Sequence, residues 1–260
     1  MSVVDLREEI RRAAECPSSE LSRYWHSAHV EVLRSLLRNP AFSSADAAAL
    51  LQRKDLPGSI IEGIADLPCV RENYPLILAF LRNPRTPAAV SLRLLKFVYL
   101  FDLVTLSLLP ALSTEVKRAA EESVLTRLPK LTVGERIALA RRAPARILCQ
   151  VLACENEAVL DAGLGNPQLT EDILLQVVNK SNAPARLILK VASHSRWSCR
   201  RSVRLALLHN PRLPLAAALK FLPHLAATDL SDLIENGNLS PQLTRYIERM
   251  AKRAPAQADS

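Results

Sequence analysis

Apolar residues along this chain fall into short blocks with helical spacing, and each block ends at a proline-containing turn. In the stretch 198–209, Val203, Ala206 and Leu207 are spaced so that they share one face of a helix. Two further apolar blocks precede it, at 170–179 and 184–193. The pattern therefore predicts three consecutive helices, over 170–179, 184–193 and 198–209.

The turn after the third of these helices is one of five similar turns. Their prolines are separated by 44, 45, 38 and 44 residues, and an asparagine precedes each of them except Pro129, which follows Leu128. The corner residues are Asn39, Pro40, Asn83, Pro84, Pro129, Asn166, Pro167, Asn210 and Pro211. Small residues recur four positions before the asparagine position, at Ser35, Ala79, Val124, Ala162 and Ala206. A period near 44 residues predicts stacked helical repeats.

Each feature of the turn has a physical reason. Asparagine tolerates the left-handed conformation that closes a helix, and the proline after it cannot continue that helix. Ser43, Thr132 and Thr170 follow three residues after a proline and are suited to cap the next helix, and prolines at 87 and 214 are suited to its first turn. We therefore interpret the asparagines as structural turn residues and not as a ladder that binds a peptide.

The predicted fold is all-α: a right-handed α-solenoid of about five three-helix repeats in a single domain over 1–253. Second helices are expected to start at Pro57, Pro144 and Pro184. Two helices, at about 4–14 and 19–38, would cap the N-terminal end within 1–42. The repeats would span 43–86, 87–131, 132–169, 170–213 and 214–253, followed by a disordered tail at 254–260.

Three helices in forty-odd residues, with proline at helix starts, make the chain similar to the armadillo/HEAT superfamily, including bacterial HEAT-like repeat proteins. The resemblance is architectural and covers nearly the whole chain. It implies a curved rod whose third helices line a concave groove for a protein or peptide partner.

Composition and termini fit a soluble helical protein. Hydrophobic residues make up 49% and aromatic residues 4%, which favours helix over sheet. The five cysteines form no CxxC pair, so we expect reduced, mostly buried thiols in a cytoplasmic protein. The first residues lack the pattern of a signal peptide. The longest apolar window, 97–112, contains Asp102 and is too short to span a bilayer, so it predicts a buried core helix and no membrane insertion.

Motifs of enzymes and cofactor sites are missing from the sequence. It contains no GxGxxG, P-loop, HExxH or GxSxG motif, so we expect no enzyme and no cofactor. His26, His29 and Glu31 would share a helix face, but with no further ligand we interpret the histidines as a surface or capping pair, not a metal site. Bacterial DNA glycosylases built from HEAT-like repeats use an Asp beside Trp and Tyr, and no Asp lies near Trp197 in this sequence.

Positive charge is concentrated near one end of the chain. The net charge is +8, and residues 173–228 contain no Asp or Glu. Six residues of this segment form the candidate partner-binding surface: Arg196, Trp197, Arg200, Arg201, Arg204 and His209. Two interpretations stay open, a solvated face and a surface for an acidic partner. Because Glu155, Glu157 and Asp161 form an acidic patch nearby, a protein partner is favoured, with nucleic acid as the alternative.

Overall fold

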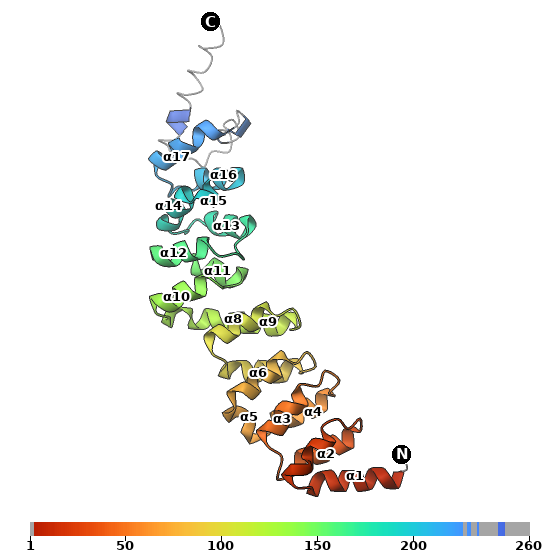
Figure 1. The fold of residues 1–260 in the computed structure, drawn as a ribbon. Coiled ribbons are helices and arrows are strands. Elements are labelled where there is room, and N and C mark those ends of the chain that lie inside the picture. Colours follow the sequence, from red (N-terminus) through yellow and green to blue (C-terminus); the bar gives the residue numbers. More distant parts are fainter. Residues whose placement is uncertain (1–2, 226–227, 230–232, 234–243, 248–260) are drawn as a thin grey trace. The chain divides into compact units, whose positions relative to one another are not determined.

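A computed structural model describes residues 3–225, 228–229, 233 and 244–247 (Figure 1). All secondary structure in these residues is helical, which confirms the predicted all-α class. The chain divides into two compact units, Met1–Thr126 and Arg127–Ser260. Only part of the fifth predicted repeat, 214–253, is described, and the predicted tail at 254–260 lies outside the described residues.

The helices of the first unit follow in chain order: α1 (Val3–Glu15), η1 (Ser18–Tyr24), α2 (Val30–Arg38), α3 (Ser44–Leu51), α4 (Gly58–Ala65), α5 (Pro68–Glu72), α6 (Tyr74–Arg82), α7 (Ala88–Leu94), η2 (Leu95–Phe97), α8 (Leu100–Leu108) and α9 (Thr114–Arg127). Those of the second unit are η3 (Leu128–Lys130), α10 (Val133–Ala140), α11 (Ala145–Val151), α12 (Glu157–Leu164), α13 (Glu171–Val178), α14 (Ala185–Ser193), α15 (Ser195–Ser198), α16 (Arg201–His209), α17 (Leu215–Phe221) and η4 (Leu222–His224).

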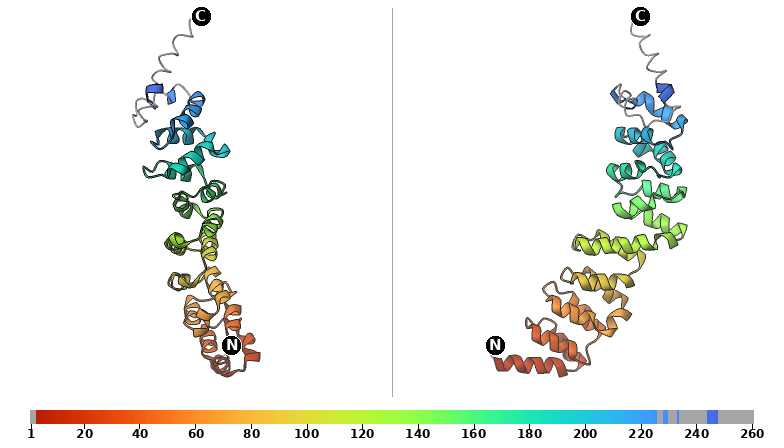
Figure 2. Two further views of the ribbon diagram at one scale, coloured as in Figure 1. Left: turned by 90° about the vertical axis from the view of Figure 1, so that its left-hand side faces the viewer. Right: turned by 180° about the vertical axis from the view of Figure 1, so that it is seen from behind.

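Within each unit, helices that are not neighbours in sequence pack in rows. In the first unit, α2 packs against α1 and α4, and α3 packs against α6. In the second unit, α12 lies between α10 and α14, while α13 lies between α11 and α16 (Figures 1 and 2). The core of the second unit contains aliphatic side chains such as Leu160, Leu174 and Ile188, which are fully buried.

Helix starts follow the predicted capping chemistry. Ser43, Thr132 and Thr170 are N-cap residues, and each hydroxyl accepts a hydrogen bond from the backbone N–H three residues later, at 3.3 to 3.4 Å. Prolines stand at the N-caps of the predicted second helices α4, α11 and α14. Pro87 and Pro214 also occupy N-caps, one position earlier than the first-turn placement that the sequence suggested.

The corner asparagines differ from expectation in backbone conformation. Asn39, Asn83 and Asn210 have φ angles of −67°, −78° and −81°, so the predicted left-handed turn is wrong. All four corner asparagines are buried, and each Nδ2 donates to carbonyl groups at or just after the end of a helix that lies earlier in the chain. The acceptors are Ala13 and Cys16 for Asn39, Leu51 and Arg53 for Asn83, Ala140 and Ala143 for Asn166, and Val178 for Asn210.

These contacts define an asparagine clamp, in which one side chain ties a corner to the first helix of the same repeat. Each Oδ1 also accepts a hydrogen bond from the backbone N–H two residues later, at 2.7 to 2.9 Å. The clamped segments run from α1 to α2, from α3 to α6, from α10 to α12 and from α13 to α16. The segment 1–42, expected as a cap, therefore contains the same clamp as the repeats.

Two corners lack an asparagine, and the boundary between the units lies between them. The sequence period placed one corner at Pro129, where the chain forms the 3₁₀ helix η3. A further corner at 109–113 was missed. Leu109 there has the extended backbone of the clamped corners (φ −70°, ψ 123°), and Ser113 Oγ accepts from the N–H of Val116 at 3.3 Å.

Two predicted helices are interrupted by loops whose carbonyls accept hydrogen bonds from arginine side chains. The helix expected over 19–38 is divided into η1 and α2, with the loop at 25–29 between them. The helix expected over 198–209 starts at Arg201, and α15 precedes it as a separate turn. The loop carbonyls of Trp25 and Ser27 accept hydrogen bonds from Arg53, at 2.6 and 3.0 Å. Those of Ser198 and Cys199 accept from Arg204, at 2.7 and 3.0 Å, so they are not available for helical bonds.

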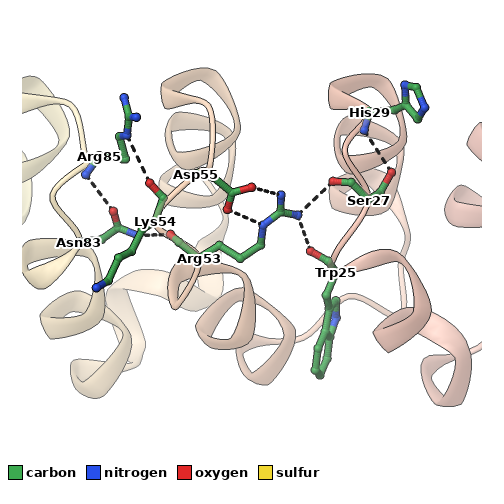
Figure 3. A network of polar contacts seen from close by, with 8 residues as sticks. All are labelled: Trp25, Ser27, His29, Arg53, Lys54, Asp55, Asn83 and Arg85. Carbon is green, nitrogen blue, oxygen red and sulfur yellow. Dashed lines mark hydrogen bonds and ion pairs between the residues drawn. The ribbon is translucent and has the colours of Figure 1, made fainter.

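Arg53 is the centre of a polar network that joins neighbouring loops of the first unit (Figure 3). Its Nε and Nη2 donate to the two carboxylate oxygens of Asp55, at 3.0 and 2.7 Å. Its own carbonyl accepts from Asn83, so the network continues into the clamp. The hydrogen bond from Arg53 lowers the pKa of Asp55 to about 2.

Asp55 should therefore stabilise the first unit in a pH-dependent way. Its pKa is depressed in the folded state, so its contribution is full above the unfolded-state pKa near 4 and is lost as the pH falls toward about 2. We expect urea unfolding of the wild type and of Asp55→Asn to differ most above about pH 5 and to converge near about pH 2. In an Arg53→Gln background the same substitution should show no such convergence, and a pH-dependent difference retained there would contradict the assignment.

Candidate functional site

The six residues of the predicted partner-binding surface lie on two short consecutive helices. Arg196 and Trp197 belong to α15, and Arg200 is the N-cap of α16. Arg201, Arg204 and His209 belong to α16. The six residues thus lie close together in the chain, and the contacts of each side chain decide whether it is available to bind a partner.

Trp197 is a core residue and not an exposed aromatic. Its side chain is 1% exposed, and the indole N–H donates to the carbonyl of Leu164, at the end of α12, at 3.0 Å. The guanidinium carbon of Arg196 lies 4.3 Å above the ring, so Arg196 covers the tryptophan. Trp197 is therefore not part of an exposed binding surface, although the sequence placed it among the partner-binding residues.

Arg204 binds backbone carbonyls of its own unit. Besides Ser198 and Cys199, it contacts the carbonyl of His224, at 3.3 Å. An arginine that satisfies three carbonyls holds the turns around it in place. Arg204 is thus a structural residue, and a charge reversal there would test folding as much as binding.

Arg200 and Arg201 both form ion pairs with carboxylates outside the acid-free segment or at its far end. Arg200 lies 3.4 Å from Glu171, at the start of α13. Arg201 makes a two-pronged contact with Asp229, whose side chain is buried. The charge of this part of α16 is therefore balanced within the chain.

His194 and His209 also make local contacts. The Nδ1 atom of His194 accepts a hydrogen bond from the N–H of Arg196, at 3.2 Å, which caps α15. Burial, together with the charge of Arg196, lowers the pKa of His194. The Nδ1 atom of His209 lies 2.8 Å from the carbonyl of Leu205 in the preceding turn of α16. Both rings thus complete helix ends.

The basic side chains of α14 pair with the acidic patch that the sequence located on α12. Lys190 lies 2.9 Å from Asp161 and 3.6 Å from Glu157, and Arg186 lies 3.6 Å from Glu157. The hydrogen bond to Asp161 raises the pKa of Lys190. The acid-free segment is therefore not an acid-free surface, because carboxylates of the preceding repeat lie against it.

The predicted histidine pair does not share a helix. His26 lies in the loop before α2, and His29 is the N-cap residue of α2 without a side-chain capping bond. Among the described residues, no three side chains of His, Cys, Asp or Glu come together as a metal site. The cysteines differ from expectation as well: four are half-buried and Cys199 is exposed, so none is fully buried.

An exposed apolar stretch at 97–108 was missed by the sequence interpretation, which placed a buried core helix there. Phe97, Tyr99, Phe101 and Leu108 are exposed, with 67% of Tyr99 accessible. Phe101, Thr105 and Leu108 follow helical spacing and share the outer face of α8. The sequence carried no signal for this face, because apolar residues stand at its exposed positions as well as at buried Leu103 and Leu106, and Ser107 is buried too.

Tyr74 fixes the start of the apolar stretch. Its hydroxyl donates to Asp102 of α8 and accepts from the backbone N–H of Tyr99, and the two tyrosine rings lie 4.4 Å apart. Burial and the bond to Asp102 raise the pKa of Tyr74 to about 12. The apolar stretch is thus held in one orientation by a neutral phenol.

None of the helices in the described ranges is both long and apolar enough to cross a membrane. Comparisons with protein-family models, with curated proteins and with solved structures find no match for this chain.

Proposed function

We propose that this chain is an armadillo/HEAT-like α-solenoid of about five repeats that acts as a non-enzymatic scaffold and binds a protein partner. The recurrence of the asparagine clamp in four segments supports the repeat architecture. In such a stack, each repeat buries its apolar face against the next, and its outer surface stays available for binding. Cytoplasmic location belongs to the same proposal.

A protein partner is favoured over a nucleic acid because basic side chains of the segment 173–228 are already paired with groups of the chain itself. Lys190, Arg200 and Arg201 are ion-paired with carboxylates, and Arg204 is bonded to carbonyls. A surface that binds phosphates gains affinity from cations that release counterions, and paired cations contribute little to that release. Mixed charge of this kind is typical of surfaces that recognise proteins.

The apolar stretch at 97–108 is the candidate contact surface in this proposal. Tyrosine and large apolar residues are enriched at the energetic centres of protein interfaces. Phe97 and Tyr99 are both exposed, and the backbone N–H of Tyr99 is bonded to Tyr74, so little conformational entropy would be lost at Tyr99 on binding. Val133 on α10 is about as accessible as Phe97 but belongs to the other unit, which makes it a matched control.

A photo-crosslinking amino acid at position 99 is expected to capture a specific protein in the native cell. After identification and purification of that protein, its affinity for Phe97→Ser/Tyr99→Ser should be at least about tenfold lower than for the wild type, which is the scale of an interface hot spot. Val133→Ser should leave the affinity within about twofold, because it removes the same kind of exposed apolar group elsewhere.

Equal losses in the two variants, or the same set of proteins captured from positions 99 and 133, would contradict this surface.

Nucleic-acid binding is the second candidate function, and the absence of Asp and Glu from 173–228 favours it. Fluorescence anisotropy with DNA and RNA decides it: micromolar binding that weakens steeply between about 50 and 200 mM salt would replace the protein-scaffold proposal.

A further inference from the structure

Each unit has a groove beside an asparagine clamp. In the first unit, a groove of about 290 Å³ lies between the C-terminal ends of α3 and α6, and Gln52, Ala79 and Arg82 line it. In the second unit, a groove of about 630 Å³ lies between the C-terminal end of α10 and α12. Arg141, Ala162 and Gly165 are among its lining residues.

The two grooves use the same positions of the repeat. Ala79 and Ala162 stand four residues before the clamp asparagine, and Arg82 and Gly165 stand directly before it. Gln52 and Arg141 are the C-cap residues of the first helix in their repeats. Recurrence in two separate units indicates that the groove is a property of the repeat. The alanine four residues before the clamp asparagine leaves the groove open, and a larger side chain at that position would fill it.

Basic residues stand on the rims of both grooves and at the corresponding positions of the other two clamped segments. The two rim positions are the C-cap of the first helix and the residue before the asparagine, and they supply Arg38, Arg82, Arg141 and His209. Neither rim position holds an acid in any of the four segments. Each segment therefore presents at least one cationic or titratable group at the same place.

These rim arginines differ from the arginines of α15 and α16. Arg38, Arg82 and Arg141 are exposed, and among the described residues no carboxylate lies within 4.0 Å of their guanidinium groups. Asp161 also lines the second groove, but Lys190 holds its carboxylate at 2.9 Å. The grooves thus combine an apolar floor with an uncompensated positive rim.

We propose that each of these grooves binds an extended acidic segment of a protein partner, with a carboxylate on Arg82 in the first unit or on Arg141 in the second, and with its backbone over Ala79 or Ala162. The positive rim supplies charge complementarity, and guanidinium groups bind carboxylates in a two-pronged geometry. A single strand of nucleic acid is disfavoured because the grooves have alanine floors and no aromatic side chain for base stacking. That the partner is a protein rests on the proposed scaffold function.

The test uses the full chain and a fluorescent peptide of alternating glutamate and alanine. At about 50 mM salt exposed charges are weakly screened, and anisotropy should show saturable binding of this peptide to the wild-type protein. A peptide with glutamine in place of each glutamate should not bind. Arg82→Gln/Arg141→Gln should weaken binding at least about fivefold. Arg71→Gln/Arg142→Gln removes two other exposed charges and should change it less than about twofold.

Absence of peptide binding by the wild type would overturn the inference, as would equal losses in the two double variants, since bulk charge would then explain them. Tighter binding of an oligonucleotide of the same net charge would overturn it too. The crosslink at position 99 does not involve the rim. If position 99 captures a partner but the peptide does not bind, the groove proposal is rejected and the scaffold function stands. If the peptide binds but no partner is captured, the groove proposal stands and the scaffold function is rejected.

Discussion

Trp197→Ala is expected to lower the free energy of unfolding by about 4 kcal/mol, the scale for removal of a buried tryptophan. The side chain is fully enclosed, and its N–H satisfies the carbonyl of Leu164, which lies at the end of α12. Truncation would leave a cavity and an unpaired buried carbonyl at once. Urea unfolding followed by far-ultraviolet circular dichroism measures the change directly.

Trp25 provides the matched control for the hydrogen-bonding part of this effect. It is half-buried, and among the described residues its buried indole N–H has no acceptor. Trp197→Phe should therefore cost about 1–2 kcal/mol more than Trp25→Phe, since only the former breaks a hydrogen bond. A Trp197→Ala variant of unchanged stability that loses its partner would restore the partner-binding role predicted from the sequence.

Local chemistry is the part of this fold that could be predicted from the sequence. Thr170 and Pro184 mark the starts of α13 and α14 because capping depends on residues within a turn of the cap. The corner at 109–113 has the same backbone but was missed, because Leu109 replaces the asparagine and the spacing departs from the 44-residue period. The 44-residue period pointed to Pro129 instead.

Long-range contacts are the part that the sequence could not supply. The asparagines were correctly placed at corners, but the reason was wrong: their amide groups reach carbonyls 23 to 32 residues away, and no left-handed backbone is involved. Trp197 and Arg204 were predicted to bind a partner because the sequence does not show the contacts that occupy their side chains. Their partners, the carbonyls of Leu164 and His224, come from other elements of the unit. A basic segment in sequence is therefore a poor guide to a basic surface once helices stack.

Asn166→Leu is expected to lower the free energy of unfolding by about 3 kcal/mol, well above the roughly 1 kcal/mol of an ordinary helix cap. The side chain is fully buried, and its Nδ2 donates to the carbonyls of Ala140 and Ala143 at 2.7 and 3.1 Å. Its Oδ1 accepts from the N–H of Gln168 at 2.7 Å. Leucine has a similar volume but leaves all three backbone groups unsatisfied, and each of them costs about 1–3 kcal/mol when buried.

Asn182→Leu is the control, because Asn182 is exposed in the loop before α14 and should change stability by less than about 0.5 kcal/mol. Hydrogen exchange then shows where the effect arises. Loss of the clamp should speed exchange at the end of α10 and in the corner after α12, the two segments that Asn166 joins. A loss near 1 kcal/mol with unchanged exchange at α10 would mean that Asn166 only ends its own helix, and the clamp would then not be what holds each repeat together.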